Sequence, residues 1–260
     1  MKSVLSVNKP LGMTPLACIE RVKKRFPELS DQKIAYAGRL DPMASGVLLL
    51  LIGDECKKRD SYQMLPKRYT LTVLFGFETD TYDLLGLITK TARPDLLSIQ
   101  EALQSKLSTL KGKHLQSYPP YSSARVQGKP LFYYARHNLL ADITIPQKTI
   151  SITEVTLDAI DTIASRKLYE EIQARLLTIT GDFRQDDIKK GWRNKLEGGK
   201  ERYVIARLSI ATSHGAYMRA IAQQLGESLG VPACAYSIVR THVGEYSIEK
   251  ALTLSSEAVE

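Results

Sequence analysis

Two short segments near the amino terminus have the clearest hydrophobic patterns. Thr14 is followed by Pro15, a pair typical of a capped helix start with proline in the first turn. Apolar residues then recur at helical spacing, at Leu16, Ile19, Val22 and Phe26. Residues 47–52 read V-L-L-L-L-I between two glycines, and this pattern predicts a strand buried on both faces.

Further elements follow along the chain. Alternating apolar and polar residues predict strands at residues 68–77, 150–158 and 203–211. A capping box from Ser98 to Glu101 predicts the start of one helix, and an apolar stripe predicts another at residues 218–229. Because these elements lack a strict β-α-β order, we expect an α+β fold with a mixed, mostly antiparallel sheet flanked by helices.

Residues 162–202 differ from their surroundings in composition. They carry many charges of both signs, the stretch G-D-F-R-Q-D-D and the only tryptophan, Trp192. We interpret this segment as an insertion between two strands of a single domain that spans residues 1–260. The sequence has no internal repeats and no low-complexity segment.

Composition and charge narrow the class of protein. The 260 residues are 43% hydrophobic and 25% charged, which is ordinary for a globular chain. A net charge of +8 favours a polyanionic partner such as nucleic acid. The first residues lack the apolar core of a signal peptide, and the longest apolar run is too short to span a bilayer. We therefore expect a soluble, cytoplasmic protein without membrane contact.

Metal and cofactor motifs are not found in the sequence. The three cysteines are far apart, so we expect no disulfide framework, and the four histidines have no partners at metal-ligand spacing. There is no phosphate-binding loop, dinucleotide fingerprint or G-x-S-x-G motif. We expect neither a metal nor a cofactor.

One carboxylate lies just before the most apolar segment of the chain. Residues 35–46 read A-Y-A-G-R-L-D-P-M-A-S-G, with Asp41 between an Arg-Leu pair and a proline. Asp-Pro flanked by glycines is a common turn, and by itself this pattern favours a turn over a catalytic acid. There is no second carboxylate nearby in the sequence that would form an acid–base pair with Asp41.

Four separated segments, taken together, resemble the pseudouridine synthases of the TruB type, which isomerise uridine in the T loop of tRNA. The first is N-K-P-L-G-M-T-P from Asn8, and the second is A-G-R-L-D-P-M-A-S-G-V-L from Ala37. The third begins K-R-Y-T-L-T-V at Lys67 and continues through P-P-Y-S-S-A-R from Pro119. The fourth is S-H-G-A-Y-M-R from Ser213, followed by R-T-H-V-G-E-Y-S-I. They cover most of the chain in the family's order.

The resemblance implies roles for individual residues. Asp41 matches the catalytic aspartate, Arg219 the arginine that holds that carboxylate through both oxygens, and Tyr69 the tyrosine that stacks on the flipped uracil and whose hydroxyl could serve proton transfer at C5. It further implies a basic RNA-binding cleft with Asp41 at its floor, and a monomeric enzyme that binds the tRNA T-arm stem-loop without a cofactor. The residues expected to shape the pocket or contact RNA are Asn8, Lys9, Tyr36, Arg39, Lys67, Arg68 and Tyr217.

The sequence also departs from the family pattern. Tyr36 stands where the family usually has histidine, Arg39 where it has threonine, and His214 where it has lysine. The resulting G-R-L-D is similar to the RluA-type synthases, and a second guanidinium could pair with Asp41 or with a phosphate. We expect no C-terminal RNA-binding PUA domain before the end at Glu260. Residues 162–202 could then contribute to RNA binding, or could serve as a spacer or protein contact.

Three functions remain open from the sequence. The first is a pseudouridine synthase that acts on the T-loop uridine of tRNA. The second is a synthase that acts on another tRNA or rRNA site. The third is a non-catalytic RNA chaperone that retains the fold; a carboxylate facing RNA phosphates argues against it.

Overall fold

A mixed sheet of ten strands is the central element of the computed structural model, which describes residues 3–254. Its order is β14-β1-β3-β12-β4-β11-β10-β7, with β2 paired to β3 and β13 paired to β12. Only β1–β14 and β3–β12 are parallel among these pairs. The strands are β1 (Val4–Lys9), β2 (Ile34–Ala37), β3 (Ala44–Ile52), β4 (Lys67–Phe75), β5 (Phe77–Thr79), β6 (Ile88–Thr91), β7 (Gly112–Ser117), β8 (Arg125–Val126), β9 (Lys129–Pro130), β10 (Gln147–Ala164), β11 (Arg202–Thr212), β12 (Ala233–Val243), β13 (Tyr246–Ser247) and β14 (Leu252–Thr253).

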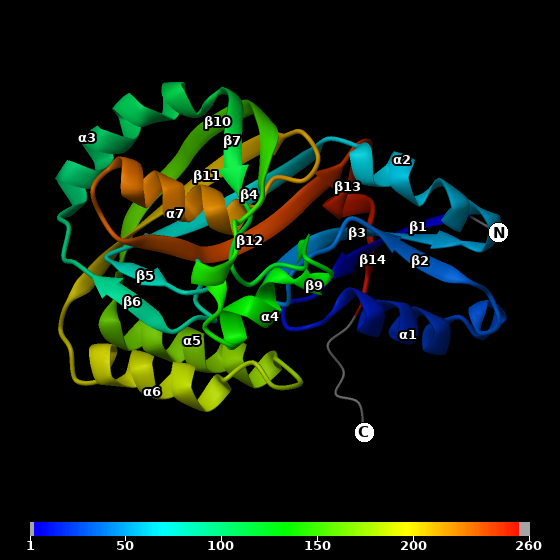
Figure 1. Cartoon of the computed structure of the whole chain (residues 1–260), viewed down its shortest axis with the longest axis horizontal. Coiled ribbons are helices and arrows are strands. Elements are labelled where there is room, and N and C mark those ends of the chain that lie inside the picture. Colours follow the sequence, from blue (N-terminus) through cyan, green and yellow to red (C-terminus); the bar gives the residue numbers. More distant parts are fainter. Residues whose placement is uncertain (1–2, 255–260) are drawn as a thin grey trace.

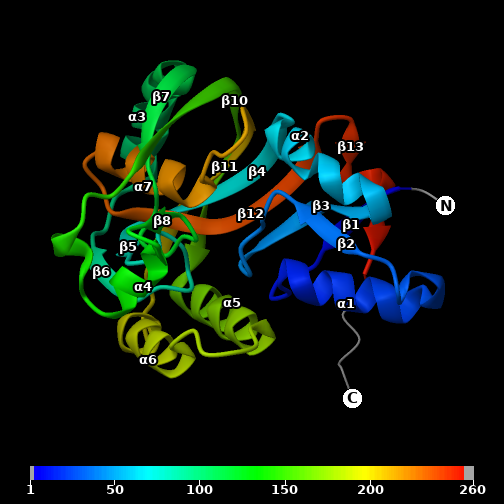
Figure 2. The ribbon, with the colours of Figure 1, turned by 45° about the vertical axis from the view of Figure 1, so that its right-hand side comes forward.

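Helices cover both faces of this sheet (Figures 1 and 2). Helix α7 packs on β12 and β4, and α3 packs on β10, against one large apolar cluster. Helices α5 and α6 pack together in a second cluster on the opposite face. The helices are α1 (Pro15–Arg25), α2 (Arg59–Met64), α3 (Leu96–Leu107), α4 (Leu131–Arg136), α5 (Ser165–Thr178), α6 (Gln185–Leu196) and α7 (Met218–Ser228). The predicted α+β class is confirmed.

Strand β3 is buried on both faces, as its unbroken apolar sequence predicts. Leu48 and Leu50 belong to the large cluster together with apolar residues of α1, whereas Val47, Leu49 and Leu51 face a third cluster near α2. All five side chains have 0% exposure. A strand with no solvent-facing side is rigid, so it fixes the loop that enters it from Asp41.

Element boundaries agree with the sequence only in part. Thr14 caps α1 as predicted, but Leu16 lies outside the apolar stripe and is 60% exposed. Helix α3 is capped by Asp95, whose carboxylate accepts from the Ser98 amide, so the predicted Ser98 capping box is wrong. Strand β4 ends at Phe75 because Gly76, with φ +103°, turns the chain there.

The chain between β10 and β11 forms the helical pair α5–α6. Ala164 and Arg202 face each other across the two strands, so the pair leaves and re-enters the sheet at one point. Trp192 is fully buried, packs on Phe77 and donates its indole N–H to the Leu84 carbonyl at 3.2 Å. Its ring is therefore part of the core and is not available to stack on RNA. Within residues 3–254, no helix has the length and apolarity needed to cross a membrane.

We predict that Trp192→Ala lowers the free energy of unfolding by about 3–5 kcal/mol, because it leaves a cavity and an unpaired carbonyl in the second cluster. The matched control is Leu177→Ala on α5, where the leucine is 87% exposed and the change should stay within about 0.5 kcal/mol. Urea unfolding followed by circular dichroism measures both. A loss below about 1 kcal/mol for Trp192→Ala would contradict this packing.

Candidate active site

Asp41 and Arg219 meet although they lie far apart in the sequence. Asp41 lies in the loop between β2 and β3, and Arg219 lies in the first turn of α7. The Arg219 Nε donates to Asp41 Oδ2 at 2.8 Å. The arginine side chain is only 4% exposed, whereas that of Asp41 is 32% exposed. The guanidinium is thus hidden and the carboxylate remains open to a substrate.

The two terminal nitrogens of Arg219 each donate to a backbone oxygen. Its Nη1 donates to the Thr81 carbonyl at 2.7 Å, and its Nη2 donates to the Tyr121 carbonyl at 3.1 Å. The sequence predicts that this guanidinium holds both oxygens of Asp41, and the structure differs because Nη1 and Nη2 are directed to these carbonyls and only Nε bonds to Asp41. One oxygen of Asp41 is therefore left without a bond to Arg219.

A second carboxylate, Asp83, lies near the same guanidinium. Its Oδ2 is 3.7 Å from Arg219 Nε, and its Oδ1 accepts from the Thr81 hydroxyl at 2.7 Å and from the Leu85 amide at 2.9 Å. Burial raises the pKa of Asp83 to about 6, against the opposing effect of Arg219. For Arg219, burial alone lowers the pKa, but Asp41 and Asp83 raise it above its ordinary value.

No role is predicted for Asp83 from the sequence. Its signal is weak, because T-D-T-Y-D also reads as a polar turn. Only the fold brings this turn, the Asp41 loop and α7 together.

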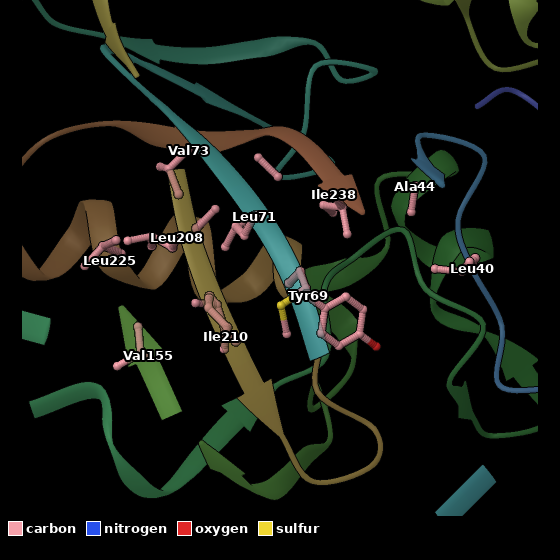
Figure 3. Packing of buried hydrophobic residues seen from close by; sticks show 14 of the residues in the cluster. Leu40, Ala44, Tyr69, Leu71, Val73, Val155, Leu208, Ile210, Leu225 and Ile238 are labelled. Carbon is pink, nitrogen blue, oxygen red and sulfur yellow. The ribbon is translucent and has the colours of Figure 1, made fainter. Parts of the chain in front are cut away.

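Tyr69 points toward the loop that carries Asp41. Figure 3 shows its ring leaving β4 on the side where Leu40 and Ala44 lie. The residue is 8% exposed and belongs to the large apolar cluster. Little of the Tyr69 ring is therefore exposed at the surface, and a base could stack on it only by entering the protein interior.

Arg240 is the second buried arginine of the site. It faces Tyr69 directly across β12 and β4, so both side chains point to the same face of the sheet. It is 2% exposed and donates to the carbonyls of Val47, Arg39 and Gly38 at 2.7, 3.3 and 3.0 Å. Burial lowers its pKa, while Tyr69 and Asp41 oppose that change.

Arg240 fixes the backbone that leads into Asp41, and the sequence analysis assigns it no role. A detectable signal exists, because an arginine in the strand sequence A-Y-S-I-V-R is unusual. A charged residue inside a buried strand indicates a specific partner.

Lys9 lies on the other side of the Asp41 loop. It is fully buried at the end of β1, and its Nζ donates to the carbonyls of Pro10 at 2.9 Å and Met13 at 2.8 Å. Burial lowers its pKa to about 8, against the raising effect of Cys18 and of Asp41. The preceding Asn8 is half-buried in β1, opposite Val47 of β3. Lys9 therefore holds the loop before α1, whereas the expected role of Asn8 stays a prediction.

Lys67 and Arg68 have different environments. The sequence predicts phosphate contacts for both, but Lys67 is 5% exposed and donates to the carbonyls of Gln63 and Leu65. Burial lowers the pKa of Lys67 to about 8, and the charges of Arg240 and Lys148 add to this. Arg68 is exposed and pairs with Glu154 through two bonds of 2.8 and 3.3 Å. Of the two, only Arg68 is accessible to a phosphate.

Tyr36 and Arg39, which depart from the family pattern, form a small surface group. Arg39 Nη2 donates to the Tyr36 hydroxyl at 3.1 Å, and the Arg59 guanidinium lies 5.6 Å from the centre of the Tyr36 ring. The bond that Arg39 makes is therefore to Tyr36 and not to Asp41. This group combines an aromatic face with two cations near the catalytic loop.

Tyr217 precedes Arg219 and caps the start of α7. Gln116, which is 2% exposed, accepts from the Tyr217 amide at 2.8 Å and donates to its carbonyl at 3.2 Å. The Tyr217 ring packs edge-on against Tyr118 at 5.5 Å. Burial and the charge of Asp41 raise the pKa of Tyr217 to about 12.

Two cavities border the site. One of about 750 Å³ is lined by Asp80, Tyr82, Tyr121 and Arg184, and one of about 490 Å³ is lined by Lys67, Arg68 and His242. Neither is lined by Asp41, and the expected basic cleft with Asp41 at its floor stays a prediction. Among the residues that the structure describes, no group of three or more histidine, cysteine, aspartate or glutamate side chains could hold a metal ion.

The fold is shared with solved structures of low sequence identity. A Cbf5-Nop10-Gar1 complex contains a chain that matches with a TM-score of 0.55 and 17% identity, over 96% of this chain and 52% of that one. An H/ACA ribonucleoprotein bound to a substrate RNA matches with a TM-score of 0.53 and 16% identity, and this chain covers half of that one. The architecture is therefore the pseudouridine synthase fold.

Sequence comparisons give the family. Residues 24–176 match the amino-terminal domain of TruB family pseudouridylate synthases. The tRNA pseudouridine synthase B of Bordetella avium is 30% identical over 98% of this chain and 86% of its own length. That of Bacillus licheniformis is 31% identical over 96% of this chain and 68% of its own length. The chain belongs to the TruB family of pseudouridylate synthases.

The raised pKa of Asp83 predicts a pH-dependent stability. Between about pH 4 and pH 6 the unfolded chain has released the Asp83 proton while the folded chain retains it, so raising the pH lowers the free energy of unfolding. Relative to Asp83→Asn, the wild type should lose at most about 3 kcal/mol across this window and then level off.

Urea unfolding at pH 4.5, 5.5, 6.5 and 7.5 measures this difference. The control is Asp31→Asn, the same substitution at an exposed acid. A constant gap between wild type and Asp83→Asn would show that the folded state does not disfavour the Asp83 carboxylate.

Proposed function

We propose that this protein converts uridine to pseudouridine in tRNA, at the uridine of the T loop. The observation that carries the proposal is the contact between the buried Arg219 and the open Asp41 carboxylate. The relatives that are about 30% identical are tRNA pseudouridine synthases B, which supports tRNA as the substrate. A net charge of +8 agrees with an RNA partner.

Asp41 supplies the ionised carboxylate that the reaction needs. The glycosidic bond from ribose C1′ to base N1 breaks, the uracil turns, and C1′ joins C5; C5 then loses its proton and N1 gains one, so the product is an isomer of uridine. A carboxylate serves the cleavage as a nucleophile or as the counter-ion of a cationic sugar. Three cations lie within electrostatic range of Asp41, because its charge acts to raise the pKa of Arg219, Lys9 and Arg240.

Tyr69 receives the extruded base in this proposal. A uridine in folded RNA must leave its stack before the enzyme can reach C1′. The phenol ring then replaces the lost stacking, an interaction worth about 1–3 kcal/mol. Its hydroxyl, next to Arg240, serves the transfer of the C5 proton.

Exposed cations near the catalytic loop hold the RNA backbone. Arg39, Arg59 and Arg68 are exposed, and Arg39 and Arg59 flank the Tyr36 ring. Such contacts release counter-ions, so RNA affinity falls as the salt concentration rises. Because Lys9 and Lys67 are buried against backbone carbonyls, we assign them to positioning of the loops and not to phosphates.

Pseudouridine mapping tests the proposal directly. RNA from cells that lack the gene should lose the T-loop pseudouridine, and wild-type protein should restore it. Asp41→Asn should not restore it, because a neutral amide cannot supply the carboxylate, and purified enzyme should lose more than about a thousandfold in turnover. Asp31→Asn serves as the matched control and should restore the modification.

Other outcomes separate the alternatives. A lost pseudouridine elsewhere in tRNA or rRNA would replace the T-loop assignment with another site. Full modification by Asp41→Asn would exclude the aspartate mechanism. No lost pseudouridine at all would favour an RNA chaperone.

Tyr69→Phe separates the two tasks of the tyrosine. The ring remains, so the Kd for a T-arm stem-loop should change by less than about threefold, whereas turnover should fall by about 10²–10⁴-fold without the hydroxyl. Tritium release from RNA labelled at uracil C5 measures turnover, and Tyr69→Leu, which lacks the ring, should weaken binding as well. Wild-type turnover in Tyr69→Phe would remove the hydroxyl from the mechanism.

A further inference from the structure

The helical pair α5–α6 is larger than its connection requires. Ala164 of β10 and Arg202 of β11 are directly paired in the sheet, and antiparallel neighbours of this kind are usually joined by two to five residues. The segment instead forms two helices with their own buried residues, including Trp192. The size of the α5–α6 pair therefore suggests a role beyond joining β10 to β11.

The turn between the two helices reaches the active-site loops. Arg184, at the start of α6, has φ +61°. Its Nη1 is 2.6 Å and its Nη2 is 3.3 Å from the two oxygens of Asp80. Its guanidinium also lies 4.5 Å from the centre of the Tyr121 ring. A paired and stacked arginine holds both partners in one geometry.

Both partners of Arg184 belong to the segments that hold Arg219. Asp80 is bonded to Thr81, whose carbonyl accepts from Arg219 Nη1, and the Tyr121 carbonyl accepts from Arg219 Nη2. Asp80 also accepts from the Leu87 amide at 2.8 Å, which closes the loop that contains Asp83. One partner of Arg184, Tyr121, thus itself supplies a carbonyl that orients Arg219. The other partner, Asp80, is the residue before Thr81, which supplies the second carbonyl.

A second contact connects the end of α5 with the Asp41 loop. Gly12 has φ +83°, and a Cβ atom added there would lie 2.4 Å from the carbonyl oxygen of Thr178. The Gly12 amide donates to the carbonyl of Pro42, the residue after Asp41, at 2.8 Å. The end of α5 therefore packs closely against the loop at Gly12, and that loop is hydrogen-bonded to Pro42, the neighbour of Asp41.

The pair is also fixed to the sheet. Arg175 of α5 donates to the Tyr236 carbonyl of β12, and its guanidinium lies 4.3 Å from the centre of the Tyr236 ring. Because the carboxyl-terminal turn of α5 contacts both the sheet, through Arg175, and the loops, through Thr178, the pair can transmit the rigidity of the sheet to the site.

We propose that α5–α6 is a brace that holds Arg219 and Asp41 in position from outside the site, with Arg184 as its main positioning residue. This proposal rests on the proposed function, because it assigns the brace to the isomerisation step. Arg184 touches neither Asp41 nor Arg219; it acts through Asp80 and Tyr121. Small displacements of reacting groups have large effects on rate, so loss of the brace should lower catalysis more than binding.

The test compares Arg184→Ala with Arg184→Lys and with Arg193→Ala. Arg193 lies on the same helix and pairs at the surface with Glu197, so it is the matched control. In single-turnover reactions on a T-arm stem-loop, Arg184→Ala should be slower by about tenfold or more, with a Kd within about threefold of wild type. Arg184→Lys should restore part of the rate, and Arg193→Ala should match wild type.

Amide hydrogen exchange of the free protein gives a readout that does not need activity. In Arg184→Ala, the peptides that contain the Leu85 and Leu87 amides should exchange at least about fivefold faster, while those of β3 remain protected. Unchanged exchange in these peptides, a rate within twofold of wild type, or an equal effect of Arg193→Ala would overturn the proposal. If wild-type protein modified no RNA, the proposed function would fail, and the exchange data alone would still decide whether the brace exists.

Discussion

The burial of one guanidinium determines how the site is assembled. Arg219 lies almost entirely out of water, and such a charge is tolerated only when its donors are satisfied. Its partners come from three separate segments, which contain Asp41, Thr81 and Tyr121. Each segment must therefore adopt one conformation for the arginine to remain buried. The stability of the fold and the position of the Asp41 carboxylate depend on the same contacts.

The other buried cations act differently on Asp41. Lys9 and Arg240 donate to backbone carbonyls, so they hold the two sides of the catalytic loop without occupying the carboxylate. Both cations are nevertheless close enough to feel Asp41, whose charge opposes the lowering of their pKa by burial. Arg219 binds one oxygen of Asp41, and Lys9 and Arg240 bind neither oxygen. The second oxygen of Asp41 therefore remains free of these three cations.

Short local patterns predicted much of the fold, and a whole-chain resemblance predicted the site. The cap at Thr14 and the apolar strand β3 could be predicted because they depend on neighbouring residues. Asp83, Arg240 and Gln116 were not assigned roles, because the contacts that connect them to the site, such as that of Asp83 with Arg219, join residues far apart in the sequence. The burial of Lys67 was missed for the same reason, since a lysine in a charged stretch looks solvent-exposed until the fold places carbonyls around it.

The position of β3 has a consequence for how the protein is made. This early strand lies between β1 and β12, and the contact between Asp41 and Arg219 joins residues 178 positions apart. Its parallel edge thus waits for β12, which is translated much later than β3. Contacts of such high sequence separation slow folding and expose apolar strands to aggregation. The Asp41–Arg219 contact therefore forms only after Arg219 has left the ribosome, so a nascent chain truncated before that residue lacks this contact.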